Sequence, residues 1–311
     1  MSKLKIFLTG GSGMVGCNLL DHPDIKQQFK IISPRRQELD LLNFYAVKSY
    51  LEKNRPDMII HAAGKVGGIQ ANIREPVAFL LDNLDIGRNI ILAAKKVGIK
   101  HLINLGSSCM YPRNYLEPMS EEMILKGELE PTNEGYALAK VITARLCDYV
   151  MREDSSYYFK TIIPCNIYGR FDKFDPDYSH LIPAIIYKIH FAKQNHQEVV
   201  EIWGNGKARR EFMYAGDLAD ALVRSIMEFN SLPMIMNIGL GYDYTINEYY
   251  QIVADVIGYK GKFFHNLSKP VGMFRKLVSI ERQKSWGWSA SYSLQDGITE
   301  TYKYFLKEYF H

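Results

Sequence analysis

The sequence predicts an α/β protein with a doubly wound parallel sheet and a smaller α/β substrate-binding domain. In the first half of the chain, short apolar runs rich in β-branched residues alternate with longer amphipathic stretches. A glycine-rich turn follows the first run, and the C-terminal third loses this regular alternation. The length of 311 residues fits about two domains of roughly 150 residues each.

The apolar runs of the first half are expected to be strands, because each is short and ends at turn-forming residues. They cover residues 4–8, 29–32, 57–63, 102–105 and 158–164. The amphipathic stretch at 77–97 predicts a helix, and right-handed crossovers then give an open parallel sheet. Farther along, the pattern predicts a strand at 199–203 and helices at 217–229 and 246–257.

Composition narrows the class of protein. A hydrophobic fraction of 47% and a charged fraction of 23% exclude a disordered chain, a collagen-like repeat and a small disulfide scaffold. The net charge of +4 is too small to indicate nucleic acid, although it suits an anionic ligand. Cys17, Cys109, Cys147 and Cys165 form no C-x-x-C pair, so we expect no metal site and a reducing, cytoplasmic location. No apolar run is long enough to predict a signal peptide or a membrane partner.

A glycine pattern lies directly after the first predicted strand. Gly10, Gly13 and Gly16 form G-x-x-G-x-x-G, which permits a tight turn, close approach of the backbone to a pyrophosphate, and close helix packing. The start of the following helix would present free N–H groups to phosphates. This context predicts a Rossmann-type dinucleotide site. The turn comprises Gly10, Gly11, Ser12, Gly13, Met14, Val15 and Gly16.

The residues after the second predicted strand indicate which dinucleotide binds. An NAD site would need an acidic residue there for the ribose 2′-hydroxyl. This chain has Arg35 and Arg36 instead, and two guanidinium groups suit a 2′-phosphate by charge and geometry. We therefore expect NADPH/NADP as the cofactor.

A Tyr-x-x-x-Lys pair forms the predicted catalytic group. Tyr136 and Lys140 would share one helix face, and we expect the lysine charge to lower the pKa of the phenol. Ser107 follows the fourth predicted strand, at the sheet edge where such folds bind ligands. Together with the glycine turn, these residues predict a catalytic site in which Tyr136 is a proton donor.

These motifs and several longer segments resemble the extended short-chain dehydrogenase/reductase family, and within it the GDP-L-fucose synthase subfamily. The resemblance covers almost the whole chain. It rests on residues 10–16, 61–69, 106–112, 129–136, 166–169, 179–180, 203–204 and 209–212. The segments Lys-Val-Gly-Gly-Ile at 65–69 and Leu-Glu-Pro-Thr-Asn-Glu at 129–134 are far more specific than the general dehydrogenase motifs.

The resemblance implies an NADPH-dependent 3,5-epimerase/4-reductase acting on a GDP-4-keto-6-deoxy sugar. Ser107, Tyr136 and Lys140 would reduce the C4 ketone. Inverting a carbon requires a base on one face and an acid on the other, and the resemblance assigns these roles to Cys109 and His180. We expect a nearby cation, Lys140 or His180, to favour the thiolate.

The resemblance also implies the remaining binding residues. The cofactor site would further include Asp40, Leu41, Ala62, Ala63, Leu105, Gly106, Pro164, Asn166, Ile167 and His180. The catalytic Ser107, Tyr136 and Lys140 would also contact the cofactor, with Lys140 holding the nicotinamide ribose. A nucleotide diphosphate needs cations, so we expect the substrate site to contain Lys188, Trp203, Arg210, Lys262 and Lys269, with Arg275 as a further candidate. By the resemblance, Trp203 and Arg210 are the foremost of these.

The chain also departs from the family pattern. Ser12 and Lys188 stand where many members have arginine, Cys165 replaces a threonine and Lys173 an asparagine, and the segments 207–208 and 269–276 are variants. Because of these departures, a GDP-linked 4-keto heptose fits the motifs as well as a 6-deoxy hexose does. The motifs also leave open a reductase without epimerase activity, an epimerase that retains NAD, and a non-catalytic nucleotide sensor.

The motifs also suggest a division of the chain. We expect residues 1–169 to form the cofactor domain, completed by about 212–242, and 170–311 to form mainly the nucleotide-sugar domain. Related enzymes are homodimers, which here would pair through the predicted helices at 78–97 and 136–151. No nucleic-acid partner is expected.

Overall fold

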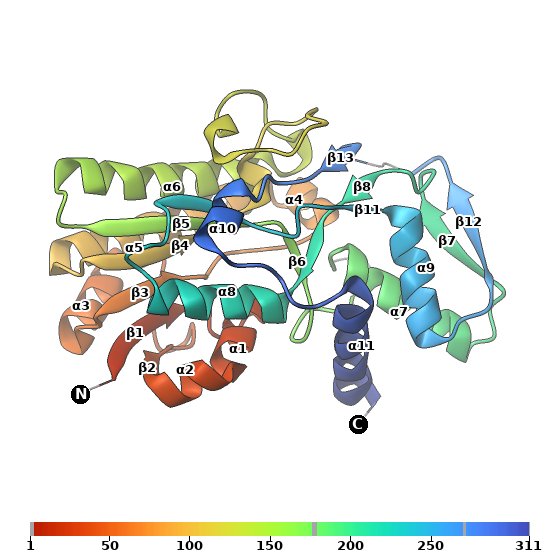
Figure 1. Cartoon of the computed structure of the whole chain (residues 1–311), viewed down its shortest axis with the longest axis horizontal. Helices are drawn as coiled ribbons and strands as arrows, with labels where there is room; N and C mark the ends of the chain where they lie inside the picture. Colours follow the sequence, from red (N-terminus) through yellow and green to blue (C-terminus); the bar gives the residue numbers. More distant parts are fainter. Residues whose placement is uncertain (1–2, 176–178, 270–271, 311) are drawn as a thin grey trace.

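The computed structural model describes residues 3–175, 179–269 and 272–310. Its centre is a six-stranded parallel sheet with the order β10-β5-β4-β3-β1-β2 (Figure 1). The sheet strands are β1 (Leu4–Thr9), β2 (Phe29–Ile32), β3 (Met58–His61), β4 (His101–Leu105), β5 (Tyr158–Pro164) and β10 (Ile235–Ile238). The predicted fold class is therefore confirmed. Each of the five strands predicted in the first half is present, within three residues of its expected bounds.

Helices cover both faces of the sheet (Figure 1). On one face lie α3 (Phe44–Asn54), α5 (Pro76–Val97) and α6 (Glu134–Glu153), and on the other lie α1 (Met14–Asp21), α2 (Pro23–Gln28) and α8 (Ala215–Met227). Alternate strand residues supply the two cores. Phe7 and Ile59 pack toward α3, α5 and α6, whereas Ile6 and Ile60 pack toward α1 and α8.

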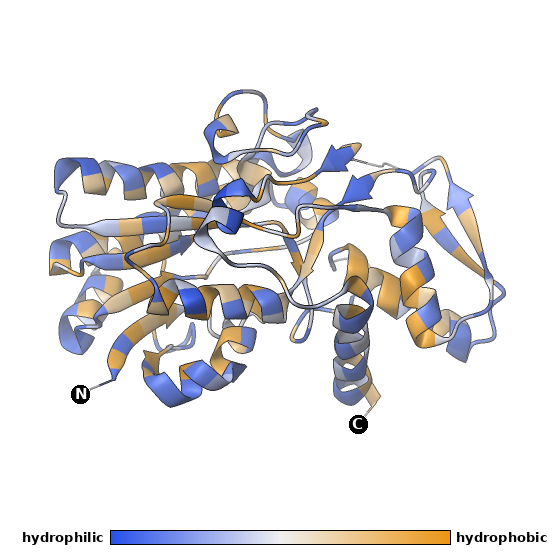
Figure 2. Ribbon diagram, viewed as in Figure 1, coloured by the Kyte–Doolittle hydropathy of each residue, from blue (hydrophilic) through white to orange (hydrophobic). Residues whose placement is uncertain are grey.

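The C-terminal part forms a smaller unit with its own apolar core. It contains α7 (Leu181–Gln194), β7 (Val199–Trp203), α9 (Ile246–Ile257), β12 (Lys262–Asn266) and α11 (Leu294–Phe310). Figure 2 shows hydrophobic residues concentrated on the central strands and along α7 and α9. Strands β7 and β12 pair in parallel, with Val199 opposite Lys262 and Trp203 opposite Asn266.

Short strands connect this unit to the sheet. Strands β8 (Arg209–Arg210), β11 (Tyr244–Thr245) and β13 (Arg275–Lys276) form a three-stranded sheet in the order β11-β8-β13, and β6 (Asn166–Tyr168) pairs with β9 (Phe212–Tyr214). The remaining elements are α4 (Ile69–Arg74), α10 (Glu281–Trp286) and the 3₁₀ turns η1 (Ser108–Met110), η2 (Glu121–Met123) and η3 (Pro131–Asn133). Among the described residues, no helix is both long and apolar enough to cross a membrane.

Candidate active site

The predicted cofactor residues gather where the parallel strands end. The glycine turn follows β1, Arg35 and Arg36 follow β2, and Ala62 and Ala63 follow β3. Leu105 ends β4 and Gly106 follows it, and Pro164 ends β5. In a parallel sheet all these carboxyl ends share one edge, so the chain brings residues from five strands to one side of the molecule.

The glycine turn is shaped for a closely approaching ligand. Gly10 adopts a φ of 76°, and a Cβ there would lie 2.8 Å from the backbone nitrogen of Ala63. A Cβ on Gly16 would overlap the carbonyl oxygen of Gly10, whereas a Cβ on Gly13 would meet only that oxygen, at 3.4 Å. Helix α1 starts after Gly13 without a side-chain cap. Its first N–H groups can therefore bind phosphate oxygens.

The two arginines after β2 are available for a further phosphate. Both side chains are exposed, and within the described part of the chain neither guanidinium has an ion pair or hydrogen bond. Asp40 is exposed as well, and its carboxylate accepts the N–H of Leu42 at 3.0 Å. Leu41 is half-buried beside it. This end of the site therefore carries unpaired positive charge.

The remaining predicted cofactor residues are held by hydrogen bonds across the strand ends. The N–H of Ala63 donates to the hydroxyl of Thr9 at 3.2 Å, and that hydroxyl contacts Nδ1 of His61 at 2.8 Å. Asn166 donates from Nδ2 to the carbonyl of Glu211 at 2.8 Å, which ties β6 to β9. Ile167 is buried, so only its backbone can reach a ligand.

Ser107, Tyr136 and Lys140 meet at the end of β4. Ser107 precedes η1, and its hydroxyl accepts the N–H of Cys109 at 3.3 Å. Tyr136 and Lys140 project from the first turns of α6, and the tyrosine hydroxyl hydrogen-bonds Ser107. The buried Lys140 Nζ donates to the carbonyl of Leu105 at 2.9 Å.

The expected effect of Lys140 on the tyrosine is wrong for this structure. Burial, followed by the charge of Cys109, raises the pKa of Tyr136, and the Ser107 hydrogen bond only partly opposes this. Lys140 does not offset the rise because its ammonium is directed to Leu105 and lies 5.9 Å from the tyrosine ring centroid. Burial also lowers the pKa of Lys140 to about 8, with Cys109 acting in the opposite direction. The phenol therefore keeps its proton at neutral pH.

Cys109 lies beside Ser107 and Tyr136, and two other side chains donate hydrogen bonds to its sulfur. Asn133 Nδ2 approaches its sulfur at 3.1 Å, and Lys276 Nζ approaches it at 3.3 Å. Lys140 or His180 was expected to be the nearby cation, and the charge of Cys109 does act on the pKa of Lys140, although the Lys140 ammonium gives its hydrogen bond to Leu105. Lys276 is the cation in contact with the sulfur, and no sequence motif assigned it a role. Neither Asn133 nor Lys276 was given a role from the sequence, although each lies in a segment that was singled out there. Asn133 lies in the family-specific segment 129–134, and Lys276 lies in the variant segment 269–276.

His180 is the residue that caps the start of α7, and it lies near enough to Lys276 and Lys173 for their charges to act on it. Its ring remains accessible, yet surrounding protein atoms and then the charges of Lys276 and Lys173 lower its pKa. Lys276 therefore acts on both members of the predicted epimerisation pair. Residues 176–178, which precede Ser179 and His180, lie outside the described residues.

Two of the predicted substrate cations lie beside Trp203 at the end of β7. The ammonium groups of Lys188 and Lys269 each lie 5.2 Å from the Trp203 ring centroid, and its indole N–H donates to Glu201 at 3.0 Å. Burial lowers the pKa of Lys188. Arg210 lies in β8 opposite Lys276 of β13, and the Lys276 ammonium contacts the sulfur of Cys109.

Two predicted cations are placed differently. Lys262 starts β12 and faces Val199, four residues from the Trp203 end of the pair, which at about 3.3 Å per residue is roughly 13 Å away. Arg275 is held by the buried carboxylate of Asp243 at 2.6 Å and by the carbonyl of Leu116 at 2.7 Å. The structure therefore does not bring Lys262 to the others, and it gives Arg275 a structural contact.

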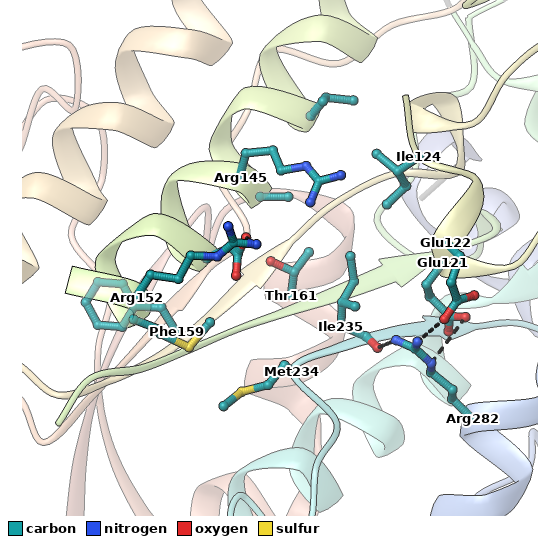
Figure 3. A pocket seen from close by; sticks show the side chains of 14 residues that line it. Glu121, Glu122, Ile124, Arg145, Arg152, Phe159, Thr161, Met234, Ile235 and Arg282 are labelled. Atoms are coloured by element: carbon teal, nitrogen blue, oxygen red, sulfur yellow. Dashed lines mark hydrogen bonds and ion pairs between the residues drawn. The ribbon is translucent and has the colours of Figure 1, made fainter. Parts of the chain in front are cut away.

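A pocket of about 260 Å³ lies elsewhere, between α6, the edge strand β10 and η2 (Figure 3). Arg282 closes one end through ion pairs with Glu121 and Glu122, and Arg145 and Arg152 of α6 line another part. None of the predicted site residues lines this pocket. The group at the strand ends is therefore the candidate active site.

Comparison with known proteins places this arrangement among nucleotide-sugar enzymes. Residues 6–239 match the model of the NAD dependent epimerase/dehydratase family. The chain is 53% identical to GDP-L-colitose synthase of Yersinia pseudotuberculosis, over 98% of this chain and 99% of that protein. It is 45% identical to GDP-L-fucose synthase of Azorhizobium caulinodans, over 97% and 96%. Among solved structures, the NADP-bound GDP-mannoheptose C4 reductase of Campylobacter jejuni matches with a TM-score of 0.88 at 29% identity, covering 98% of this chain and 99% of that one.

Proposed function

The chain belongs to the NAD dependent epimerase/dehydratase family, and we propose that it is an NADPH-dependent 3,5-epimerase/4-reductase acting on a GDP-4-keto-6-deoxy sugar. The observation that carries this proposal is the meeting of two chemical groups at the end of β4. Ser107, Tyr136 and Lys140 supply the residues of a carbonyl reductase. Cys109 lies beside them, and His180 shares its neighbour Lys276.

The cofactor proposal rests on the shape and charge of the strand ends. The uncapped start of α1 and the tight Gly10–Gly16 contact fit a pyrophosphate, and Arg35 with Arg36 fits a 2′-phosphate. The solved relative with NADP bound is consistent with this choice. When bound, NADPH supplies the hydride that reduces C4.

Tyr136 and Ser107 act on the C4 oxygen in the reduction. When the ketone binds, the Ser107 and Tyr136 hydroxyls give up their mutual hydrogen bond, and each donates its proton to the ketone oxygen, where they stabilise the negative charge that develops. Because burial raises the pKa of Tyr136, the phenol is protonated at neutral pH and can deliver its proton to that oxygen. The buried Lys140 ammonium contributes positive charge beneath this site.

Cys109 and His180 act on the carbons that flank the ketone. The protons on C3 and C5 are acidified because their removal gives an enolate with its charge on the C4 oxygen. Cys109 takes a proton from one face as a base, and His180 returns one to the other face as an acid. The lowered pKa of His180 makes its imidazolium a readier donor, although less of it is protonated at neutral pH.

The sugar itself is the finer part of the proposal. Two relatives with high identity are named for 6-deoxy products, GDP-L-fucose and GDP-L-colitose, whereas the heptose reductase is 29% identical. A panel of GDP-4-keto hexoses and heptoses, each tested for NADPH oxidation with product stereochemistry read by NMR, distinguishes these substrates. We expect oxidation with the 6-deoxy hexoses. Oxidation with heptoses alone would reassign the substrate.

We further propose a homodimer and a cytoplasmic location. Helices α5 and α6 pack against each other and expose apolar side chains, with Val77 at 66%, Leu81 at 48%, Ile142 at 44% and Tyr149 at 52%. A second copy covering these helices would bury that surface. The four cysteines are free, which fits a reducing compartment. Light scattering of the Leu81→Asp variant tests the dimer, with Val199→Asp as an exposed control on β7.

A further inference from the structure

Lys276 connects the substrate-binding strands to the predicted base. Its Nζ lies 3.3 Å from the sulfur of Cys109, although the two residues are 167 positions apart in the sequence. The side chain is half-buried, so its ammonium is only partly screened by solvent. An ammonium at hydrogen-bond distance from a sulfur stabilises the negative thiolate over the neutral thiol.

The backbone around Lys276 is fixed on several sides. Strand β13 pairs in parallel with β8, and Asp243 bridges Arg209 and Arg275 of these strands. Beyond Lys276, the N–H of Val278 donates to the buried Glu211 carboxylate at 3.0 Å, and Met119 bonds the backbone on both sides of Val278. The segment cannot move away from Cys109 without breaking these contacts. The placement of the ammonium is therefore built into the fold.

The other groups that face Cys109 cannot replace this charge. Tyr136 of α6 is a neutral phenol at physiological pH, and Asn133 of η3 donates from an uncharged amide. Lys140 of α6 influences Cys109 by charge, but its buried ammonium donates to the carbonyl of Leu105. Among the described residues, Lys276 is the cation with a hydrogen bond to the sulfur.

We propose that Lys276 is a positioning residue whose ammonium, in contact with the Cys109 sulfur, stabilises the negative charge that this sulfur needs to act as the base of the epimerisation. This inference rests on the proposed function for its chemistry, since it assigns Cys109 the removal of a proton from C3 or C5. The step is a proton transfer in which the carbon–hydrogen bond breaks, its electrons pass to the enolate, and the sulfur gains the proton. The ammonium of Lys276 keeps its own protons throughout.

Alkylation of Cys109 by iodoacetamide tests the inference without any sugar, because only the thiolate reacts. The variants are Lys276→Met, which removes the charge, and Lys276→Arg, which keeps it. Lys284→Met is the control, since Lys284 is exposed and pairs with Glu281. Peptide mass spectrometry separates Cys109 from the other three cysteines, and a thermal melt of each variant shows that it is folded.

We expect the alkylation rate of Cys109 at pH 7 to fall about ten- to a hundredfold in Lys276→Met, the factor that corresponds to a charge-assisted hydrogen bond. The rate in strong base, where every thiol is ionised, should match that of the unaltered protein. Lys276→Arg should restore most of the pH 7 rate. An unchanged rate in Lys276→Met, or an equal loss at both pH values, would overturn the proposal.

A second readout uses the reaction itself. Solvent deuterium uptake at C3 and C5 of the GDP-4-keto sugar, measured without NADPH, should fall in Lys276→Met by a factor similar to that of alkylation. A raised KM with unchanged alkylation would instead make Lys276 a substrate cation and would refute its action through Cys109. Failure of the unaltered protein to turn over any sugar would count against the proposed function alone, because alkylation does not depend on it.

Discussion

Replacing Asp243 with asparagine should loosen the three short strands that carry Arg210 and Lys276. The Asp243 side chain is 2% exposed, and its two oxygens accept from Arg209 Nε at 2.5 Å and Arg275 Nε at 2.6 Å. The substitution removes the negative charge and turns one acceptor into a donor that faces an arginine. Both pairs should therefore weaken, whereas the Asp243 carbonyl still accepts Arg209 at 2.8 Å.

The size of the expected loss in local stability depends on how exposed the two arginine side chains are. A hydrogen bond to a charged group contributes about 1.5–3 kcal/mol when buried. Here the arginine side chains are 36% and 30% exposed, so each can regain water and the contribution of each pair falls to about 1 kcal/mol. The expected local loss is about 2 kcal/mol, which corresponds to roughly a thirtyfold decrease in protection from hydrogen exchange.

Hydrogen exchange read by mass spectrometry measures this loss. The peptides to follow contain the N–H of Arg209, which donates to Phe274, and the N–H of Ile246, which donates to Ala208. Glu281→Gln is the control, because its ion pair with Lys284 is exposed on both sides and should contribute under about 0.5 kcal/mol. Unchanged protection in Asp243→Asn would refute the view that this carboxylate fixes the strands.

Further predictions concern the cofactor, the base and pH. Cys109→Ser should abolish deuterium uptake at C3 and C5 while NADPH-dependent reduction at C4 continues, as NMR of the product would show; normal uptake would remove Cys109 from its role. Arg35→Ala with Arg36→Ala should raise the KM for NADPH by about tenfold or more and leave that for NADH nearly unchanged, because only the 2′-phosphate contacts are lost; a parallel rise for both cofactors would contradict this. Because burial lowers the pKa of Lys140 from 10.5 to about 8, the unfolded chain binds more protons between these values, so stability from this residue rises with pH there. Urea denaturation of Lys140→Met between pH 8 and 10 should lack that increment, and an identical pH dependence would argue against it.

Local sequence patterns predicted the framework of the fold well. Helix α5 spans Pro76–Val97 where periodicity predicted 77–97, and β5 has its predicted bounds, because both follow from short-range alternation of apolar residues. The glycine turn was also predictable, since its function depends on adjacent residues. Ser107 and Tyr136 met as expected because Ser107 follows the carboxyl end of β4, where ligands bind in parallel sheets, and the start of α6 packs against that end.

Features that depend on long-range pairing were not predictable. The contact of Lys276 with Cys109 requires β13 to pair with β8, and two-residue strands leave no periodic pattern in the sequence. Lys262 was misplaced because only the register of β12 against β7 shows that it lies at the far end from Trp203. The pKa of Tyr136 is raised by burial of the phenol and then by the charge of Cys109, and spacing along a helix determines neither.

The most direct test of the proposed reaction is turnover of GDP-4-keto-6-deoxy-mannose with NADPH in deuterated water. NADPH oxidation is followed by absorbance and the product by NMR. The arrangement of Ser107, Tyr136, Lys140, Cys109 and His180 predicts one NADPH oxidised for each sugar, with the cofactor hydrogen at C4 and solvent deuterium at inverted C3 and C5. No NADPH oxidation with this or any other GDP-4-keto sugar would contradict the assignment of the chain as an epimerase/reductase.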